Sequence, residues 1–427
     1  MDEFWRKLVF SSEAEYLEFC SSYAALPVGF SAATCRLDFA PEERPDRRLL
    51  MDLSFVRFDG AAYSWTALFT RNAVCGVPVA IGKERLGNPL EGFVINNRIA
   101  NVGTAEGRKR ALAVLDAFSS VSGVPSARLL PVSTGIIGWE LPYTAMSDRA
   151  SWLVSQLGSI DGLALARAIM TTDSYPKLIS LPLGEGKLWA MAKGAGMIEP
   201  NLATMLVFIF TDVKIEQSDM DEVLIEAVDM SFNRISVDGD QSTSDSVFCV
   251  STGVFPAVSR DEFAEALNTV CAYLAEQIVR NGEGTSHVVR MSVSGWDDKT
   301  CVDIGRAIIN SELVKTAIYG NDPNVGRIAA ACGAYCGKNA IECDPSKMRI
   351  YLGTELVYDK GKFLLDKEKE ALLSSLLRDC YMPPDKTWPP HFKYMDIRLE
   401  YPGRGKAILW GSDLSHQYVH INADYRS

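Results

Sequence analysis

The chain has 427 residues, of which 47% are hydrophobic, and its formal net charge is −11. It has enough apolar residues for two or three packed domains, and its acidic balance argues against nucleic acid or an anionic membrane surface as the main partner. Residues 1–10 lack the features of a signal peptide, and no apolar run approaches the roughly 18 residues of a membrane-spanning helix. The sequence therefore predicts a soluble, cytoplasmic protein.

The first third of the chain alternates short β-rich runs with turns. Residues 49–60 and 63–82 are two such runs, and Asp59-Gly60 at the end of the first predicts a β-hairpin. Later, apolar side chains recur three to four residues apart, as on the buried face of an amphipathic helix. This spacing predicts helices over residues 106–122, 149–171, 219–231 and 261–281. Strands and helices without regular βαβ alternation favour an α+β fold with layered packing.

The second half has two features of its own. Residues 292–401 carry a separate pattern of strands and helices, which predicts a smaller C-terminal lobe. Residues 416–422 alternate in the manner of a strand, which would turn His416 and His420 to one face. A pair of surface or hydrogen-bonded histidines is a more ordinary outcome there than a metal site.

Ten cysteines are an ordinary number for a chain of this length in a reducing compartment, and no Cys-x-x-Cys pair occurs. Cys332, Cys336 and Cys343 are close in sequence, but no histidine lies near them. The pattern gives little support to a zinc site, and no metal ion is predicted.

The most informative segment is residues 193–206, KGAGMIEPNLATML. Gly194, Gly196 and Pro200 predict a tightly turned backbone, and the apolar run that follows predicts a buried strand. Thr204 then lies where a bent loop enters a rigid strand, a position suited to holding one reactive atom. Taken alone, most threonines in such a place are structural.

This segment resembles the self-cleavage motif of the ornithine acetyltransferase (glutamate N-acetyltransferase) family. The resemblance implies that the chain breaks its own bond between Ala203 and Thr204, which gives chains 1–203 and 204–427. The freed Thr204 is then the nucleophile, and its own α-amino group accepts the hydroxyl proton. The first half of the chain contains no histidine, so without this amino group a base for the nucleophile would have to come from the second half.

Two upstream segments resemble the same family. Residues 130–138, LPVSTGIIG, are similar to a loop in which the equivalents of Thr134 and Gly135 form the oxyanion hole. Residues 171–177, TTDSYPK, are similar to a segment whose first threonine, here Thr171, contacts the substrate. From the residues alone, a tight glycine turn and a helix-ending turn before proline remain alternative interpretations.

Further matches extend the resemblance over most of the chain. Residues 237–245, VDGDQSTSD, and 319–327, YGNDPNVGR, are similar to family loops. The resemblance also implies that Lys193, Glu283, Asn422 and Ser427 gather around one bound amino acid, together with Thr171 and Thr204. On simpler interpretations, Glu283 caps the turn after the preceding helix and Ser427 merely ends the chain.

The chain also departs from the family pattern. Residues 96–107 lack the usual loop with Cys-Thr-Gly, and other residues replace the family's Asn, Trp or Lys at Ser244, Val325, His287 and His420. The nucleophile, oxyanion and lysine positions are intact. Acyl transfer is therefore more firmly implied than the identity of the amino-acid substrates.

Together, the resemblance implies an α+β protein: a layered α/β sandwich with an N-terminal-nucleophile threonine and a smaller C-terminal α/β lobe. It implies transfer of an acetyl group from N-acetylornithine to glutamate in arginine biosynthesis, by a heterotetramer of two α and two β chains with no bound cofactor. Whether acetyl-CoA is also a co-substrate stays open. The alternatives are an N-terminal-nucleophile amidase or aminopeptidase, an acyltransferase with another amino-acid substrate, and a binding protein descended from the family.

Overall fold

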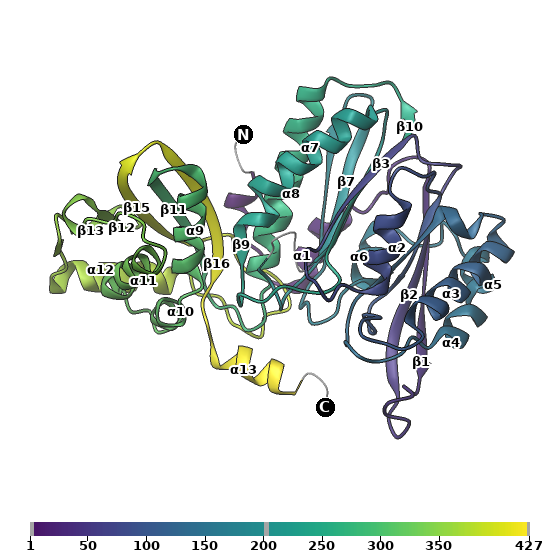
Figure 1. The fold of residues 1–427 in the computed structure, drawn as a ribbon, viewed down its shortest axis with the longest axis horizontal. Coiled ribbons are helices and arrows are strands. Elements are labelled where there is room, and N and C mark those ends of the chain that lie inside the picture. Colours follow the sequence, from purple (N-terminus) through teal and green to yellow (C-terminus); the bar gives the residue numbers. More distant parts are fainter. Residues whose placement is uncertain (1–3, 200–204, 425–427) are drawn as a thin grey trace.

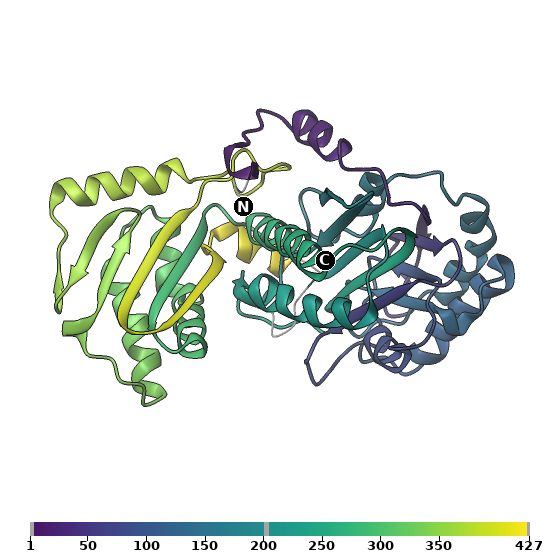
Figure 2. The ribbon, with the colours of Figure 1, turned by 90° about the horizontal axis from the view of Figure 1, so that it is seen from above.

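The computed structural model describes residues 4–199 and 205–424. Ala203, Thr204 and Ser427 lie outside these described residues. The chain forms a larger part from mainly its earlier residues and a smaller part from mainly its later ones, side by side in Figures 1 and 2. Within the described ranges, no helix is both long and apolar enough to cross a bilayer.

The larger part is built on two sheets packed face to face. The first contains, in spatial order, β1 (Phe30–Phe39), β2 (Leu49–Phe58), β4 (Gly92–Asn96) and β5 (Leu129–Ser133). The second contains β3 (Ser64–Phe69), β10 (Ser246–Phe255), β8 (Leu206–Val213), β7 (Gly186–Lys193) and β6 (Lys177–Leu183). Aromatic rings join their inner faces: Phe30 stacks on Phe210 with ring centroids 4.5 Å apart. The apolar run after residue 204 is thus a central strand, β8, with every side chain buried.

Helices cover the outer face of each sheet (Figure 1). The first sheet is covered by α3 (Gly107–Ser122), α4 (Tyr143–Asp148) and α5 (Ala150–Ser155), and the second by α7 (Gln217–Met230) and α8 (Arg260–Arg280). Two shorter helices, α2 (Val77–Arg85) and α6 (Gly162–Ala168), contact strands of both sheets. The order helix, sheet, sheet, helix is the layered α/β sandwich that was predicted.

Most of the predicted helices are confirmed, and one is divided. The helices predicted at residues 106–122, 219–231 and 261–281 correspond to α3, α7 and α8. The segment 149–171 instead contains α5 and α6, because Gly158 adopts a left-handed φ of 82° and Asp161 begins a new helix by accepting a hydrogen bond from the backbone N–H of Ala164.

The predicted hairpin at Asp59-Gly60 is wrong. Strand β2 pairs with β1 and β4, whereas β3 pairs with β10 in the other sheet. A turn does form, with Gly60 at a φ of 101°, but it carries the chain from one sheet to the other. Strand β3 instead forms the edge of the second sheet, where α7 packs against it and nearly all of its side chains are buried.

The smaller part has a seven-stranded sheet and its own apolar core, which runs from Val289 to Leu409. The strands, in spatial order, are β14 (Lys362–Phe363), β13 (Glu355–Asp359), β12 (Arg349–Leu352), β15 (Met395–Gly403), β11 (Val288–Trp296), β16 (Gly405–Ser412) and β9 (Ile235–Ser236). Its helices are α9 (Asp298–Ile309), α10 (Glu312–Tyr319), α11 (Val325–Lys338) and α12 (Lys367–Asp379). Strand β9 comes from the middle of the sequence and joins this sheet to the sandwich.

The two ends of the described chain lie against other segments. Near the start, just before α1 (Glu13–Ser21), the Phe10 N–H donates to the Pro390 carbonyl over 3.1 Å. Near the end, residues 416–423 form a helix, α13 (His416–Ala423), and not the predicted strand. Ser415 caps this helix by accepting a hydrogen bond from the Tyr418 N–H, a local signal that outweighs the alternation of a short segment.

Candidate active site

A cavity of about 410 Å³ lies where loops of the sandwich meet α13. Six predicted site residues line it although they are far apart in sequence: Thr134, Gly135, Thr171, Lys193, Glu283 and Asn422. The remaining lining residues are Ile136, Ile137, Thr172, Gly196, Met197, Ser242, Thr243 and Ser244. The structure therefore brings together every predicted site residue that it describes.

Lys193 is the central cation of this cavity. It is the last residue of β7 and is 7% exposed. Its Nζ donates to the hydroxyl oxygens of Thr134 and Thr171, each at 3.2 Å. In the antiparallel pairing of β7 with β8, Lys193 lies opposite Leu206. The described chain therefore enters β8 beside the lysine, two residues after position 204.

Gly135 occupies a position that only glycine fits. Its φ is 124°, and a Cβ added there would lie 2.2 Å from the carbonyl carbon of Arg98. The neighbouring residues are fixed, because the Thr134 N–H donates to Asn96 and the Ile136 N–H donates to Arg98. Among the described residues, the N–H of Gly135 has no hydrogen-bond partner. This amide and the Thr134 hydroxyl are two donors at the cavity wall.

Asp173 fastens the two loops that carry Thr171 and Lys193. Its carboxylate accepts hydrogen bonds from the Thr171 N–H at 3.0 Å and from the Gly194 N–H at 2.7 Å, and it pairs with Lys177 at 2.5 Å. Burial raises the pKa of this carboxyl, but Lys177, Lys193 and the Gly194 N–H outweigh burial and hold the pKa at about 2. In the sequence, Asp173 belongs to the TTDSYPK match, but no pattern there indicates this role.

Glu283 and Asn422 meet at the other side of the cavity. Glu283 follows the end of α8, and its backbone N–H donates to the Ala195 carbonyl at 2.9 Å. Its carboxylate accepts a 2.7 Å hydrogen bond from the Asn422 side chain on α13. Burial raises the pKa of Glu283 despite hydrogen bonds from Thr172 and Asn422. A Cβ at Gly196 would lie 2.3 Å from this carboxyl group, so glycine leaves the space that Glu283 occupies.

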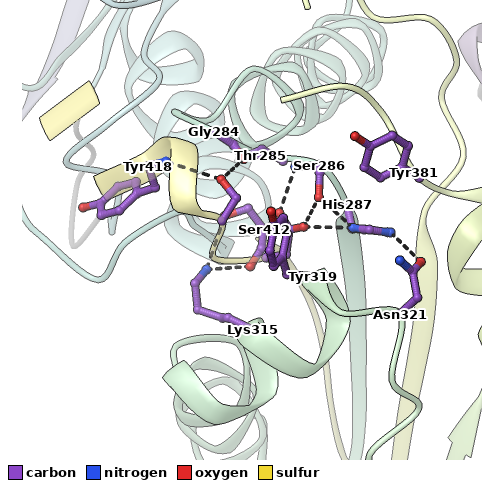
Figure 3. Close-up of polar contacts among 12 residues, drawn as sticks. Gly284, Thr285, Ser286, His287, Lys315, Tyr319, Asn321, Tyr381, Ser412 and Tyr418 are labelled. Atoms are coloured by element: carbon purple, nitrogen blue, oxygen red, sulfur yellow. Dashed lines mark hydrogen bonds and ion pairs between the residues drawn. The ribbon is translucent and has the colours of Figure 1, made fainter. Parts of the chain in front are cut away.

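A buried polar network joins the segment after Glu283 to the start of α13 (Figure 3). The Ser286 N–H donates to Asp413 over 2.9 Å, and the ring of His287 contacts Asp413 at 2.8 Å and Asn321 at 3.2 Å. The Ser415 hydroxyl, which caps α13, donates to the Gly284 carbonyl at 2.6 Å. His287, where the family pattern has lysine, thus ties the segment after Glu283 to the end of β16.

Asp238 holds the turn that precedes residues 200–204. Its carboxylate accepts the N–H groups of Met197 and Ile198, at 2.6 and 2.7 Å. Met197 has a left-handed φ of 57°, a strained conformation for this residue type. Burial raises the pKa of Asp238, whereas these backbone N–H groups lower it. Asp238 belongs to the quoted VDGDQSTSD match, but its role depends on a contact 40 residues away that sequence alone does not reveal.

Two substituted positions differ in their relation to the cavity. Ser244 lines it, next to Thr243, whose buried hydroxyl has no hydrogen-bond partner among the described residues. Val325 begins α11 and packs into the core of the smaller part. Only the first departure can therefore change the cavity directly.

The two C-terminal histidines do not form a joint site. The His416 ring lies 3.3 Å from the Tyr319 hydroxyl, whereas His420 pairs with Asp424 at 3.0 Å. They are separately hydrogen-bonded, as the simpler interpretation of the sequence predicted.

Comparison with known proteins agrees with the motifs. A sequence model of the ArgJ family matches residues 44–427. The arginine biosynthesis bifunctional protein ArgJ 2 of Clostridium acetobutylicum is 37% identical over 368 residues, which cover 85% of this chain and 90% of that protein. ArgJ of Nitratidesulfovibrio vulgaris is 37% identical over 417 residues, covering 95% and 100%. A crystal structure of ArgJ from Bacillus halodurans is 30% identical with a TM-score of 0.45, over 51% of this chain and 98% of that one. The resemblance to ornithine acetyltransferases is confirmed, and the chain belongs to the ArgJ family.

Proposed function

We propose that this protein is an acetyltransferase of arginine biosynthesis, which moves an acetyl group from N-acetylornithine to glutamate through an acyl-Thr204 intermediate. The observation that carries the proposal is the cavity itself. It gathers a cation, a carboxylate and two candidate oxyanion donors beside the start of β8. The names of the two ArgJ relatives, bifunctional proteins of arginine biosynthesis, favour the same reaction.

The first step of the proposal is self-cleavage between Ala203 and Thr204, giving chains 1–203 and 204–427. Both described flanks of this bond are held: Asp238 binds the backbone at 197–198, and β8 is paired from Leu206 onward. Because the backbone is held on both sides of the bond, attack of the threonine hydroxyl on the preceding carbonyl is favoured. The two products then assemble as a heterotetramer of two α and two β chains.

The chemical step uses the donors of the cavity wall. Thr204 attacks the acetyl carbonyl of N-acetylornithine while its α-amino group accepts the hydroxyl proton. The Thr134 hydroxyl and the Gly135 N–H donate to the oxyanion of the tetrahedral intermediate. Ornithine leaves with the proton, and glutamate then collects the acetyl group by the reverse sequence.

Charge explains how the cavity orients an amino acid. Lys193, whose ammonium donates to two hydroxyl groups among the described residues, suits the substrate carboxylate. Glu283 suits the side-chain ammonium of N-acetylornithine, because burial of this carboxyl favours a cationic partner. The Asn422 side chain holds the Glu283 carboxylate in place, and Ser427 completes the substrate-binding site. No bound cofactor takes part, and acetyl-CoA is a candidate alternative donor.

Intact-mass analysis tests the proposal directly. The wild-type protein should give two chains, one ending at Ala203 and one beginning at Thr204. Thr204→Ala should remain a single chain. Incubation with N-acetylornithine alone should add about 42 Da to chain 204–427, the mass of an acetyl group in a covalent intermediate. Glutamate should remove this adduct with ping-pong kinetics. Release of free acetate without glutamate would instead indicate a hydrolase, and a single active chain would refute both cleavage and mechanism.

A further inference from the structure

Three cysteines of the smaller part form a compact group away from the candidate active site. The Sγ atoms of Cys332, Cys336 and Cys343 all lie within 4.8 Å of one another. The first two are buried and the third is partly exposed. None of them lines the cavity described above. Their proximity is therefore a separate feature of the chain.

The fold builds this group from one helix and the loop after it. Cys332 and Cys336 lie one turn apart on the buried face of α11. The chain then reverses at Ala340, whose left-handed φ of 54° is uncommon for a residue with a side chain. The Ile341 N–H closes the reversal by donating to the Cys336 carbonyl at 2.9 Å. This return brings Cys343 back over the two helical cysteines.

Residues on both sides of Cys343 are anchored. The Trp296 ring N–H donates to the Glu342 carbonyl at 2.8 Å, and the Asp344 N–H donates to the Tyr401 hydroxyl at 3.0 Å. The two anchoring rings stack on each other with centroids 4.1 Å apart. The loop is thus ordered by contacts that do not involve the thiols. The three sulfur atoms are therefore already close together before an ion binds.

We propose that Cys332, Cys336 and Cys343 bind one soft divalent metal ion, Zn²⁺, through three thiolate bonds. Thiolates select such ions, and Zn–S bonds of about 2.3 Å in a tetrahedron place sulfur atoms about 3.8 Å apart. The present spacing therefore needs to close by at most about 1 Å in the same geometry.

Binding releases three protons to the solvent, one from each thiol, and forms three Zn–S bonds. The described residues supply no fourth ligand of the Cys, His, Asp or Glu type to this group. A water molecule takes that position on the side of Cys343, the partly exposed member of the group. Water there also stabilises the single net negative charge of three thiolates around a divalent cation. The ion would join α11 to the loop that follows it.

Metal titration of the full-length protein tests this site. Protein freed of metal by a chelator and kept reduced should bind one Zn²⁺ per chain by native mass spectrometry. Co²⁺ in its place should give the thiolate charge-transfer absorption of a tetrahedral site. Cys343→Ser should abolish this absorption and weaken Zn²⁺ binding by more than the about 10–100-fold typical of losing an outer-shell partner.

Cys301→Ser is the matched control, because Cys301 is buried in the same core but its thiol donates to the Gly295 carbonyl instead. It should keep the Co²⁺ absorption.

A second experiment needs no substitution. Zn²⁺ should slow the alkylation of Cys343 by iodoacetamide about tenfold or more, since a bound thiolate is not a free nucleophile. The alkylation of Cys75 should not change. Absence of the absorption, or its survival in Cys343→Ser, overturns the proposal. So does a protein that binds no ion when reduced and forms a disulfide within the group when it is exposed to air.

Discussion

The buried pair of Asp173 and Lys177 offers a sharp test of how the candidate site is held together. Both side chains are fully buried, with an Nζ to carboxylate distance of 2.5 Å. Asp173→Asn removes the charge but keeps the size of the side chain, and it leaves the Lys177 ammonium buried without a counter-ion. Removing one partner of a buried pair typically destabilises a protein by about 3–5 kcal/mol. We expect a loss of this size in the free energy of unfolding at neutral pH.

The pH dependence identifies the cause of that loss. In the wild type the pKa of Asp173 is lowered to about 2, so its contribution is complete above the usual pKa of an aspartate and is lost as the pH falls towards 2. Burial lowers the pKa of Lys177, and Asp173 raises it. In Asp173→Asn the lysine pKa should fall further below that of the unfolded chain. The unfolded state then binds more protons, and the stability deficit should shrink as the pH rises.

Urea unfolding at several pH values measures both effects. The variants are compared in a Thr204→Ala background, so that every protein is one covalent chain. Lys177→Met added to Asp173→Asn should recover part of the stability and remove the pH dependence. The exposed pair of Arg108 and Glu84 provides the control, because Glu84→Gln should change the stability by less than about 1 kcal/mol. An unchanged urea midpoint in Asp173→Asn, or a deficit that does not vary with pH, would refute the argument.

Three further predictions concern the reaction. Thr134→Ala should lower kcat about 10²–10³-fold, as loss of one oxyanion donor commonly does, with the folded state unchanged by circular dichroism. Glu283→Gln should raise KM for N-acetylornithine about tenfold or more, because a charge-assisted contact becomes a neutral one. Since burial raises the pKa of Glu283, the wild-type KM should rise on acidification at a higher pH than a free glutamate would cause, and the Gln variant should lack that rise. Asp238→Asn should slow the appearance of chains 1–203 and 204–427 in a time course of intact masses, because it loosens the backbone at Met197 and Ile198.

The sequence predicts well those features that depend on contiguous residues. The glycines and the apolar run around residue 204 predicted a bent loop before a buried strand, and β8 confirms the strand. The three-to-four-residue spacing located α3, α7 and α8 within two residues. These features are local because hydrophobic periodicity and turn residues determine them without knowledge of the partner.

Features that depend on a distant partner were wrong or missed. The turn at Asp59-Gly60 exists, but β3 pairs with β10, which lies far along the chain, and not with β2. The helix α13 was mistaken for a strand, since eight residues with mixed polarity fit either period and only the Ser415 cap distinguishes them. The roles of Asp173 and Asp238 were not assigned, because each is defined by backbone N–H groups of another segment.

These two carboxylates suggest how one chain can hold a reactive loop and a substrate cavity with the same contacts. Asp173 fixes the backbone at Gly194, and Asp238 fixes it at Met197 and Ile198. Between these points Gly196 lies against Glu283, so the turn that leads towards residue 200 also forms a wall of the cavity. A carboxylate that accepts backbone N–H groups constrains the main chain without occupying the space that a ligand needs. In the proposed mechanism, the backbone up to Ile198 is therefore held for cleavage before residue 204, while Lys193 and Glu283 stay available to an amino acid.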